Sequence, residues 1–93
     1  MGNATLSLSR TVYVNNPLGL HARAAAKIAK LAEKASTGVW ITKCGETADA
    51  SSIIDILTLA AEQGSRVTIK VDNPLDIHIL NAIETLVQMG FGE

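Results

Sequence analysis

Residues 66–90, RVTIKVDNPLDIHILNAIETLVQMG, place a strand directly before a helix. Apolar and polar side chains alternate over 66–71, which is typical of a strand with one covered face and one polar face. The segment Asn73–Asp76 then supplies a capping asparagine, a proline suited to the first helical position and an aspartate suited to the first turn. Gly90 suits a left-handed helix end. Between them, apolar residues at helical spacing predict a buried stripe formed by Ile79, Ala82, Ile83 and Leu86.

The segments before residue 66 show the same alternation of strand and helix patterns. Period-two patterns and β-branched residues predict strands over 5–14, 39–42 and 47–50, the last two joined by a hairpin turn at 43–46. Helical spacing predicts helices over 22–35 and 52–61. The order βαββαβα favours an α+β fold, an open-faced sandwich with an antiparallel four-stranded sheet and three helices on one face. At this length we expect one domain spanning residues 1–93.

Composition argues against several classes of partner. A net charge of −1 and an aromatic content of 3% favour neither a nucleic acid nor an anionic membrane as partner. No apolar run is long enough to span a membrane, and the first residues lack the layout of a signal peptide. Cys44 is the only cysteine, which fits a reducing compartment. We therefore expect a cytoplasmic protein with no cofactor. We also expect no metal site, because the two histidines and the single cysteine lie far apart in sequence.

The segment Gly19–Arg23, Gly-Leu-His-Ala-Arg, lies where the first strand pattern has ended and the first helix begins. A histidine at this junction faces the unpaired N–H groups of the first helical turn, which together with the helix dipole favour an anion. Arg23 adds a planar set of donors that matches phosphate oxygens. The pattern indicates a histidine that carries a phosphoryl group. Taken alone, His21 is more consistent with a histidine that merely ends a loop, and the neighbouring motifs are needed to favour the phosphoryl carrier.

Three segments together resemble the HPr family of phosphocarriers of the phosphotransferase system. Residues 19–23 are similar to the family's active-site motif, residues 48–54 (Ala-Asp-Ala-Ser-Ser-Ile-Ile) to its second signature, and Gln63-Gly64 with the following strand also match. The similarity covers about residues 9–91. Ala24 stands where the family usually has proline, and Leu18 stands where sugar-transporting members often have asparagine. With the ending Met89–Glu93, these features resemble the nitrogen-related NPr branch.

The resemblance implies roles for the residues of the first motif. His21 would accept a phosphoryl group on Nδ1 from enzyme I that phosphoenolpyruvate has charged, and would pass it to an enzyme IIA protein. Arg23 would hold the phosphate, assisted by the backbone of Ala22 and Arg23. The chain would then be a substrate of its partner enzymes and not an enzyme itself, and we expect a monomer.

Ser52 and Asp55 form a Ser-x-x-Asp pattern that predicts a capping box at the start of the second helix. In many members of the family a serine at this position is phosphorylated by a dedicated HPr kinase, so the resemblance implies a second interpretation, a regulatory site. The negative charge of Asp55 would oppose that modification. Both interpretations stay open at this point.

The second helix carries more apolar residues than one side of a short helix can bury. We expect Ile53, Ile54 and Leu57 to stay exposed and to contact enzyme I and enzyme IIA, as the resemblance implies. Burial in the core or in an oligomer interface is the alternative, above all for Ile53.

Two other functions compete with the phosphocarrier. The first is a regulatory interaction module, whose phosphorylation at His21 or Ser52 controls partner binding without sugar transport. The second is a small enzyme that uses His21 as a general base. The sequence pattern places no carboxylate beside His21, which disfavours this second alternative.

Overall fold

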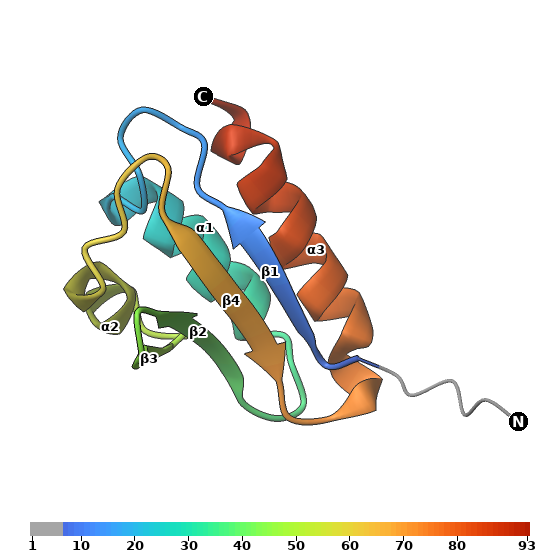
Figure 1. Cartoon of the computed structure of the whole chain (residues 1–93). Coiled ribbons are helices and arrows are strands. Elements are labelled where there is room, and N and C mark those ends of the chain that lie inside the picture. The colour runs from blue at the N-terminus through green and yellow to red at the C-terminus, as the bar shows by residue number, and fades with distance from the viewer. Residues whose placement is uncertain (1–6) are drawn as a thin grey trace, which may run out of the picture.

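The strands of the computed structural model, which describes residues 7–93, form one antiparallel sheet in the order β1-β4-β2-β3. The view in Figure 1 looks onto the sheet, with α1 and α3 behind it and α2 beside the end of β3. This arrangement confirms the predicted open-faced α+β sandwich and its order of elements. The helices and strands are β1 (Ser9–Tyr13), α1 (Ala22–Ala32), β2 (Val39–Lys43), β3 (Glu46–Asp49), α2 (Ile53–Thr58), β4 (Arg66–Val71), the 3-10 turn η1 (Pro74–Asp76), α3 (Ile77–Gln88) and the 3-10 turn η2 (Gly90–Gly92).

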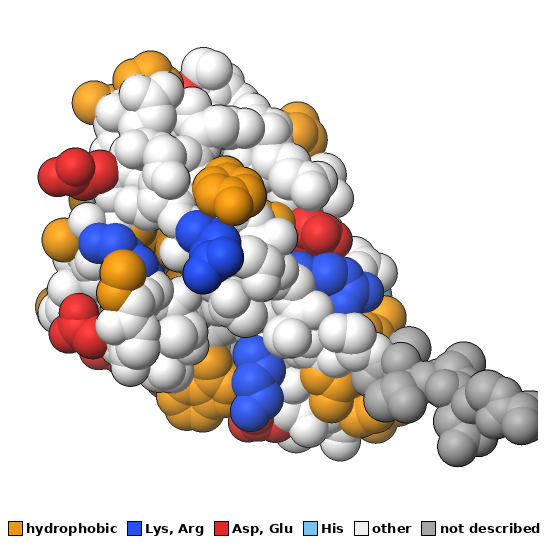
Figure 2. All heavy atoms as spheres, in the orientation of Figure 1, with side chains coloured by type: hydrophobic (Ala, Val, Ile, Leu, Met, Phe, Trp, Pro, Cys, Tyr) orange, Lys and Arg blue, Asp and Glu red, His pale blue; other side chains and the backbone are white. Residues whose placement is uncertain are grey.

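The open face of the sheet is polar. In the strand register Thr11 lies opposite Thr68, Thr68 opposite Thr42, and Thr42 opposite Thr47, so a row of threonines crosses all four strands. The hydroxyls of its two outer pairs are hydrogen-bonded, at 3.1 Å and 2.9 Å. Figure 2 shows this face as mostly white, with Lys and Arg side chains and separate apolar side chains scattered over it. The alternation of the strands therefore places the apolar core on the helix side alone.

The core lies between the sheet and the helices and includes Val12, Ile28, Ile41, Ile69 and Ile83, each at most 3% exposed. The predicted stripe of the last helix is wrong in part. Ile79 and Ile83 are buried, but Ala82 and Leu86 are half-buried, and Leu80 and Val87 take the inner positions. A helix packed against both a sheet and α1 buries a wider arc than a simple stripe.

The hairpin between β2 and β3 turns over two residues. Cys44 and Gly45 have φ of 48° and 83°, the left-handed conformation of both central residues that suits a tight hairpin. The predicted turn at residues 43–46 is therefore confirmed.

Several predicted boundaries differ from the structure for tertiary reasons. The first strand begins at Ser9, while residues 5 and 6 of the prediction lie outside the described part of the chain. The second helix ends at Thr58 and not at the predicted residue 61. Its following carbonyls are used elsewhere: Lys43 Nζ donates to the carbonyl oxygens of Leu59 and Ala60, at 3.1 Å and 3.2 Å.

The first helix ends at Ala32, three residues before the predicted end, because the next segment binds Asp76. The Asp76 carboxylate is fully buried and accepts from Ser36 N, Thr37 N and Thr37 Oγ1 at 2.8 to 2.9 Å. These bonds, led by the one from Ser36 N, lower the pKa of Asp76 below its ordinary value. Asp76 thus connects the α1–β2 loop to α3, a role that its position in a first helical turn did not predict.

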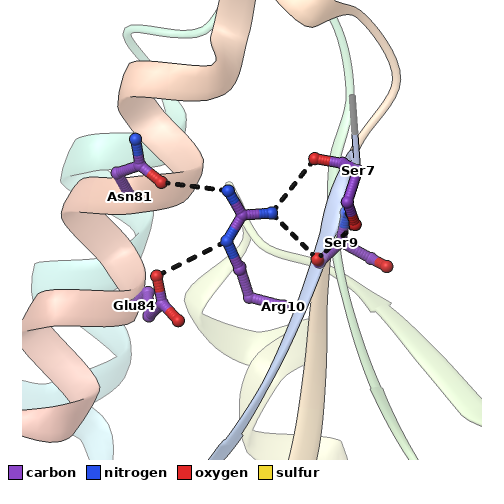
Figure 3. Close-up of polar contacts among 5 residues, drawn as sticks. All are labelled: Ser7, Ser9, Arg10, Asn81 and Glu84. Atoms are coloured by element: carbon purple, nitrogen blue, oxygen red, sulfur yellow. Dashed lines mark hydrogen bonds and ion pairs between the residues drawn. The ribbon is translucent and has the colours of Figure 1, made fainter. Parts of the chain in front are cut away.

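β1 is tied to α3 by Arg10 (Figure 3). Its guanidinium donates to the carbonyl oxygens of Ser7 and Ser9, both at 3.0 Å, and to Asn81 Oδ1 at 3.4 Å. Arg10 Nε lies 3.6 Å from Glu84 Oε1. These contacts hold the edge strand against the helix layer.

None of the helices in the described range is long and apolar enough to cross a membrane.

Candidate functional site

The loop between β1 and α1 is held in one conformation by its own sequence. Gly19 has a φ of +64°, and a Cβ at this position would lie 2.4 Å from the carbonyl oxygen of Ala61. Leu20 N donates to that same oxygen at 2.8 Å, and the buried Asn16 donates from Nδ2 to Gly19 O at 2.8 Å. Only glycine fits this close approach of two backbone segments. The residue that follows Leu20 is therefore presented in a defined position.

That residue, His21, is the N-cap of α1. Its backbone is extended, with φ −72° and ψ 178°, and its carbonyl accepts the first helical bond from Ala25 N at 2.8 Å. The ring does not enter the core, since the His21 side chain is 24% exposed. Arg23 N donates to His21 Nδ1 at 3.2 Å, so this ring nitrogen faces the amino end of the helix. Ala22, the first helical residue, is exposed between them.

Arg23 shares a surface hollow with His21, Leu18 and Glu93. Its side chain is exposed, and the same hollow is open to an incoming group. His21 also lines a second hollow, together with Pro17, Leu18, Leu20 and residues 60–63. An anion held beside Nδ1 would therefore meet the guanidinium and the first amides of α1 together.

Glu93 is a member of this site that the sequence pattern missed. One of its carboxylate oxygens is hydrogen-bonded to His21 Nε2, and the other accepts from Asn16 Nδ2 at 3.1 Å. The bond from Asn16, followed by the one from His21, lowers the pKa of Glu93 below its ordinary value of 4.5. The sequence pattern placed no carboxylate beside His21, and the fold brings one there. Seventy-two residues separate the two in sequence, so no local spacing could have joined them.

Ser52 is the N-cap of α2, the helix that packs against α1. Its Oγ accepts from Asp55 N at 3.2 Å, which is one half of the predicted capping box. The other half is wrong, because Asp55 Oδ2 accepts from Asp49 N at 2.6 Å instead of returning to Ser52. The pKa of Asp49 is lowered by bonds from Ser51. Two carboxylates therefore flank Ser52, which is half-buried.

The apolar residues of α2 divide between core and surface. Ile56 is fully buried, whereas Ile53, Ile54 and Leu57 are 40%, 78% and 39% exposed. The structure therefore leaves the three candidate docking residues accessible, and it does not bury Ile53 in the core as the alternative required. They lie on a helix next to α1, whose first residues carry His21 and Arg23.

Comparison with known proteins agrees with this geometry. Residues 8–89 match the family described as "PTS HPr component phosphorylation site". The chain is 40% identical over 86 residues to the phosphocarrier protein HPr of Cupriavidus necator, covering 92% of this chain and 97% of that protein. It is 32% identical over 89 residues to the phosphocarrier protein NPr of Klebsiella oxytoca, covering 95% and 99%.

The fold gives the same result. The structure of HPr from Thermoanaerobacter tengcongensis superimposes with a TM-score of 0.86 at 32% identity, covering 91% of this chain and 96% of that one. The matched residues 8–89 include the helix-capping histidine, its arginine and the whole sheet. The chain belongs to the HPr family of phosphocarrier proteins of the phosphotransferase system.

Proposed function

We propose that this chain accepts a phosphoryl group on Nδ1 of His21 from enzyme I charged by phosphoenolpyruvate, and passes it to an enzyme IIA protein. The observation that carries the proposal is the position of His21 as N-cap of α1, with Nδ1 3.2 Å from Arg23 N and the Arg23 side chain lining the same hollow. In this function the chain is a substrate of enzyme I and of the enzyme IIA protein, and it is phosphorylated and dephosphorylated only by reacting with them.

The chemistry needs a nucleophile and a place for negative charge. The Nδ1 lone pair attacks phosphorus, the N–P bond forms, and the bond to the donor breaks with its electrons left on the donor. The Arg23 amide, which donates to Nδ1 before transfer, is then within reach of a phosphoryl oxygen, together with the Ala22 amide and the Arg23 guanidinium. Positioning and charge stabilisation supply most of the catalysis in such transfers.

Docking of the partners would use the exposed apolar residues of α2. Ile53, Ile54 and Leu57 are exposed on α2, the helix that contacts α1, and burying such side chains is favourable when a partner covers them. Ser52 is the N-cap of the same helix, which supports a regulatory role, because a phosphate there would add negative charge at the start of α2. Its modification by an HPr kinase is the second, regulatory function, and the flanking carboxylates of Asp49 and Asp55 oppose it.

The same proposal leads to expectations for the location, the oligomeric state and the partners of the chain. We expect a cytoplasmic monomer, with enzyme I, enzyme IIA proteins and an HPr kinase as partners. A general-base enzyme is the weaker alternative even with Glu93 beside His21, because the relatives are phosphocarriers.

The test is phosphate uptake. Labelled phosphoenolpyruvate and enzyme I should yield a phosphorylated chain whose phosphate is labile in acid and stable in base, and the label should move to a cognate enzyme IIA protein. His21→Ala should take up none. Uptake by the His21→Ala protein, or uptake without transfer to any enzyme IIA protein, would contradict the carrier function.

A further inference from the structure

A carboxylate lies against the ring nitrogen of His21 that the proposed chemistry does not use. Glu93 Oε2 is bonded to Nε2, while Nδ1 faces Arg23 N. The contact is partly shielded from water, since the His21 and Glu93 side chains are 24% and 23% exposed. Neither the family match, which ends at residue 89, nor the motif of residues 19–23 includes Glu93.

The chain brings Glu93 to this position by a defined turn. Gly90, Phe91 and Gly92 have φ of 62°, 60° and 75°, three successive left-handed residues that fold the segment back toward the site. Phe91 is 1% exposed and anchors the turn in the core, and its carbonyl accepts from Lys27 Nζ at 2.7 Å.

Asn16 then fixes the carboxylate itself. Its side chain is 2% exposed, and Nδ2 donates to both Gly19 O and Glu93 Oε1, at 2.8 Å and 3.1 Å. One buried amide therefore ties the loop that presents His21 to the carboxylate that contacts it. The hydrogen bonds from Asn16 and His21 favour the ionised carboxylate of Glu93 first, and the nearby charge of Lys27 adds to them, while Arg23 lines the same hollow.

The two contacts of the ring select the same tautomer. A backbone N–H can only donate, so Nδ1 accepts the bond from Arg23 N and carries a lone pair. An ionised carboxylate can only accept, so Nε2 carries the proton that Glu93 binds. Such a partner on the second nitrogen determines which nitrogen of a histidine is free to react.

We propose that Glu93 is a positioning residue for phosphoryl transfer, which holds the proton of His21 on Nε2 and leaves the lone pair on Nδ1. This inference rests on the proposed function. When Nδ1 attacks phosphorus, the ring becomes an imidazolium that still carries its Nε2 proton, and the Glu93 carboxylate stabilises that positive charge. When the acceptor attacks phosphorus, the N–P electrons return to Nδ1. The proton stays on Nε2 in both directions, so the carrier needs no separate base.

The experiment compares Glu93→Ala and Glu93→Gln with the wild-type chain, and uses Glu33→Gln as the control. Glu33 is an exposed glutamate just after the far end of α1, so its substitution makes the same charge change away from the site. Each protein is phosphorylated in two ways, by enzyme I with phosphoenolpyruvate and by the small donor phosphoramidate, which needs no docking. The ¹⁵N chemical shifts of the neutral His21 ring report its tautomer, and thermal unfolding reports the fold.

We expect Glu93→Ala to react about 10-fold or more slowly with both donors, a loss of the size seen when the hydrogen-bonding partner of a metal-bound histidine is removed. Its ¹⁵N shifts should move from the Nε2–H pattern toward a mixture of tautomers. Glu93→Gln should keep the Nε2–H pattern, because its amide oxygen still accepts the hydrogen bond. It should be phosphorylated more slowly than the wild type, because the negative charge that stabilises the imidazolium is lost. Glu33→Gln should match the wild type in rate and tautomer.

The outcomes separate the two proposals. A wild-type chain that neither donor phosphorylates overturns the carrier function. A wild-type chain that is phosphorylated, beside a Glu93→Ala protein with unchanged rate or unchanged tautomer, overturns only the positioning role. Slower reaction with enzyme I but not with phosphoramidate also overturns it, since the loss would then lie in docking.

Discussion

Gly19 is the residue on which the position of His21 depends most directly. Its φ is +64°, and a Cβ on this residue would lie only 2.4 Å from Ala61 O, which leaves no room for a side chain. Gly19→Ala should therefore lower the free energy of unfolding by about 2 kcal/mol or more, since the left-handed conformation alone costs roughly 1–2 kcal/mol. Denaturant unfolding measures this.

Gly45 is the matched control for that substitution. It has a φ of +83°, but a Cβ there would meet nothing within 4 Å. Gly45→Ala should lose only the conformational part, roughly 1–2 kcal/mol, and therefore less than Gly19→Ala. If Gly19→Ala and Gly45→Ala lowered the free energy of unfolding equally, the close approach of residue 19 to Ala61 O would not contribute to the cost.

Arg23 supplies the only side-chain cation in the hollow it shares with His21 and Glu93, among the described residues. Arg23→Ala should slow phosphorylation by enzyme I about 10-fold or more, because an ionic donor to the phosphate is lost. Arg23→Lys should recover part of the rate as a point charge. Thermal unfolding should stay unchanged for both variants, since the side chain is exposed. If Arg23→Ala were phosphorylated by enzyme I at the wild-type rate, the proposed role of Arg23 in binding the phosphate would be wrong.

At the scale of single elements, α2 divides its apolar residues between the core and a surface. Ile54, the most exposed of the three docking candidates at 78%, can be changed without opening the core. Ile54→Asp should lower kcat/KM for enzyme I about 10-fold, with an unchanged Tm. Leu75→Asp is the control, because Leu75 is 72% exposed and belongs to η1, just before α3, and not to α2. Equal effects of the two substitutions would contradict docking on α2.

Asp76 governs where α1 ends and how its loop meets α3. Asp76→Asn keeps the shape but replaces an acceptor by a donor facing the Ser36 and Thr37 amides, so Tm should fall by roughly 5 °C or more. Thermal unfolding followed by circular dichroism measures it. An unchanged Tm would show that the loop is held by other contacts.

The same carboxylate makes part of the stability depend on pH. Its pKa is lowered in the folded chain, first by the bond from Ser36 N, so it stabilises the fold fully above its ordinary pKa of 3.8. This contribution is lost as the pH falls through the lower pKa of the folded state. Urea unfolding between neutral pH and about pH 2 should therefore show a steeper acid loss for the wild type than for Asp76→Asn. Parallel curves would contradict this assignment.

For the whole molecule, the sheet and the helix layer share one core, and Arg10 ties β1 to α3 at the surface (Figure 3). We therefore propose one domain and expect one cooperative unfolding transition. Trp40, the only tryptophan, lies on β2 and donates from Nε1 to Asp72 at 3.0 Å, so its fluorescence reports the sheet. It should change together with helical circular dichroism. Two separate midpoints would contradict a single unit.

The sequence by itself determined the order of the elements, the polar open face, the hairpin turn and the segment that carries His21, Ala22 and Arg23. These are local matters: side-chain period, capping residues and glycine or proline positions act within a few residues of one another. Resemblance to the HPr family added roles for residues that local patterns cannot assign, such as Ser52 and Ile54.

Only the tertiary structure decided the end of α1, the partner of Asp55, the loop bonds of Asp76 and the carboxylate beside His21. Each depends on groups far apart in the chain: Asp76 binds residues 39 and 40 positions away, and Glu93 meets His21 across 72. Such contacts form because folding buries polar groups that must then find partners wherever the chain passes. No spacing in the sequence records which distant group will be there.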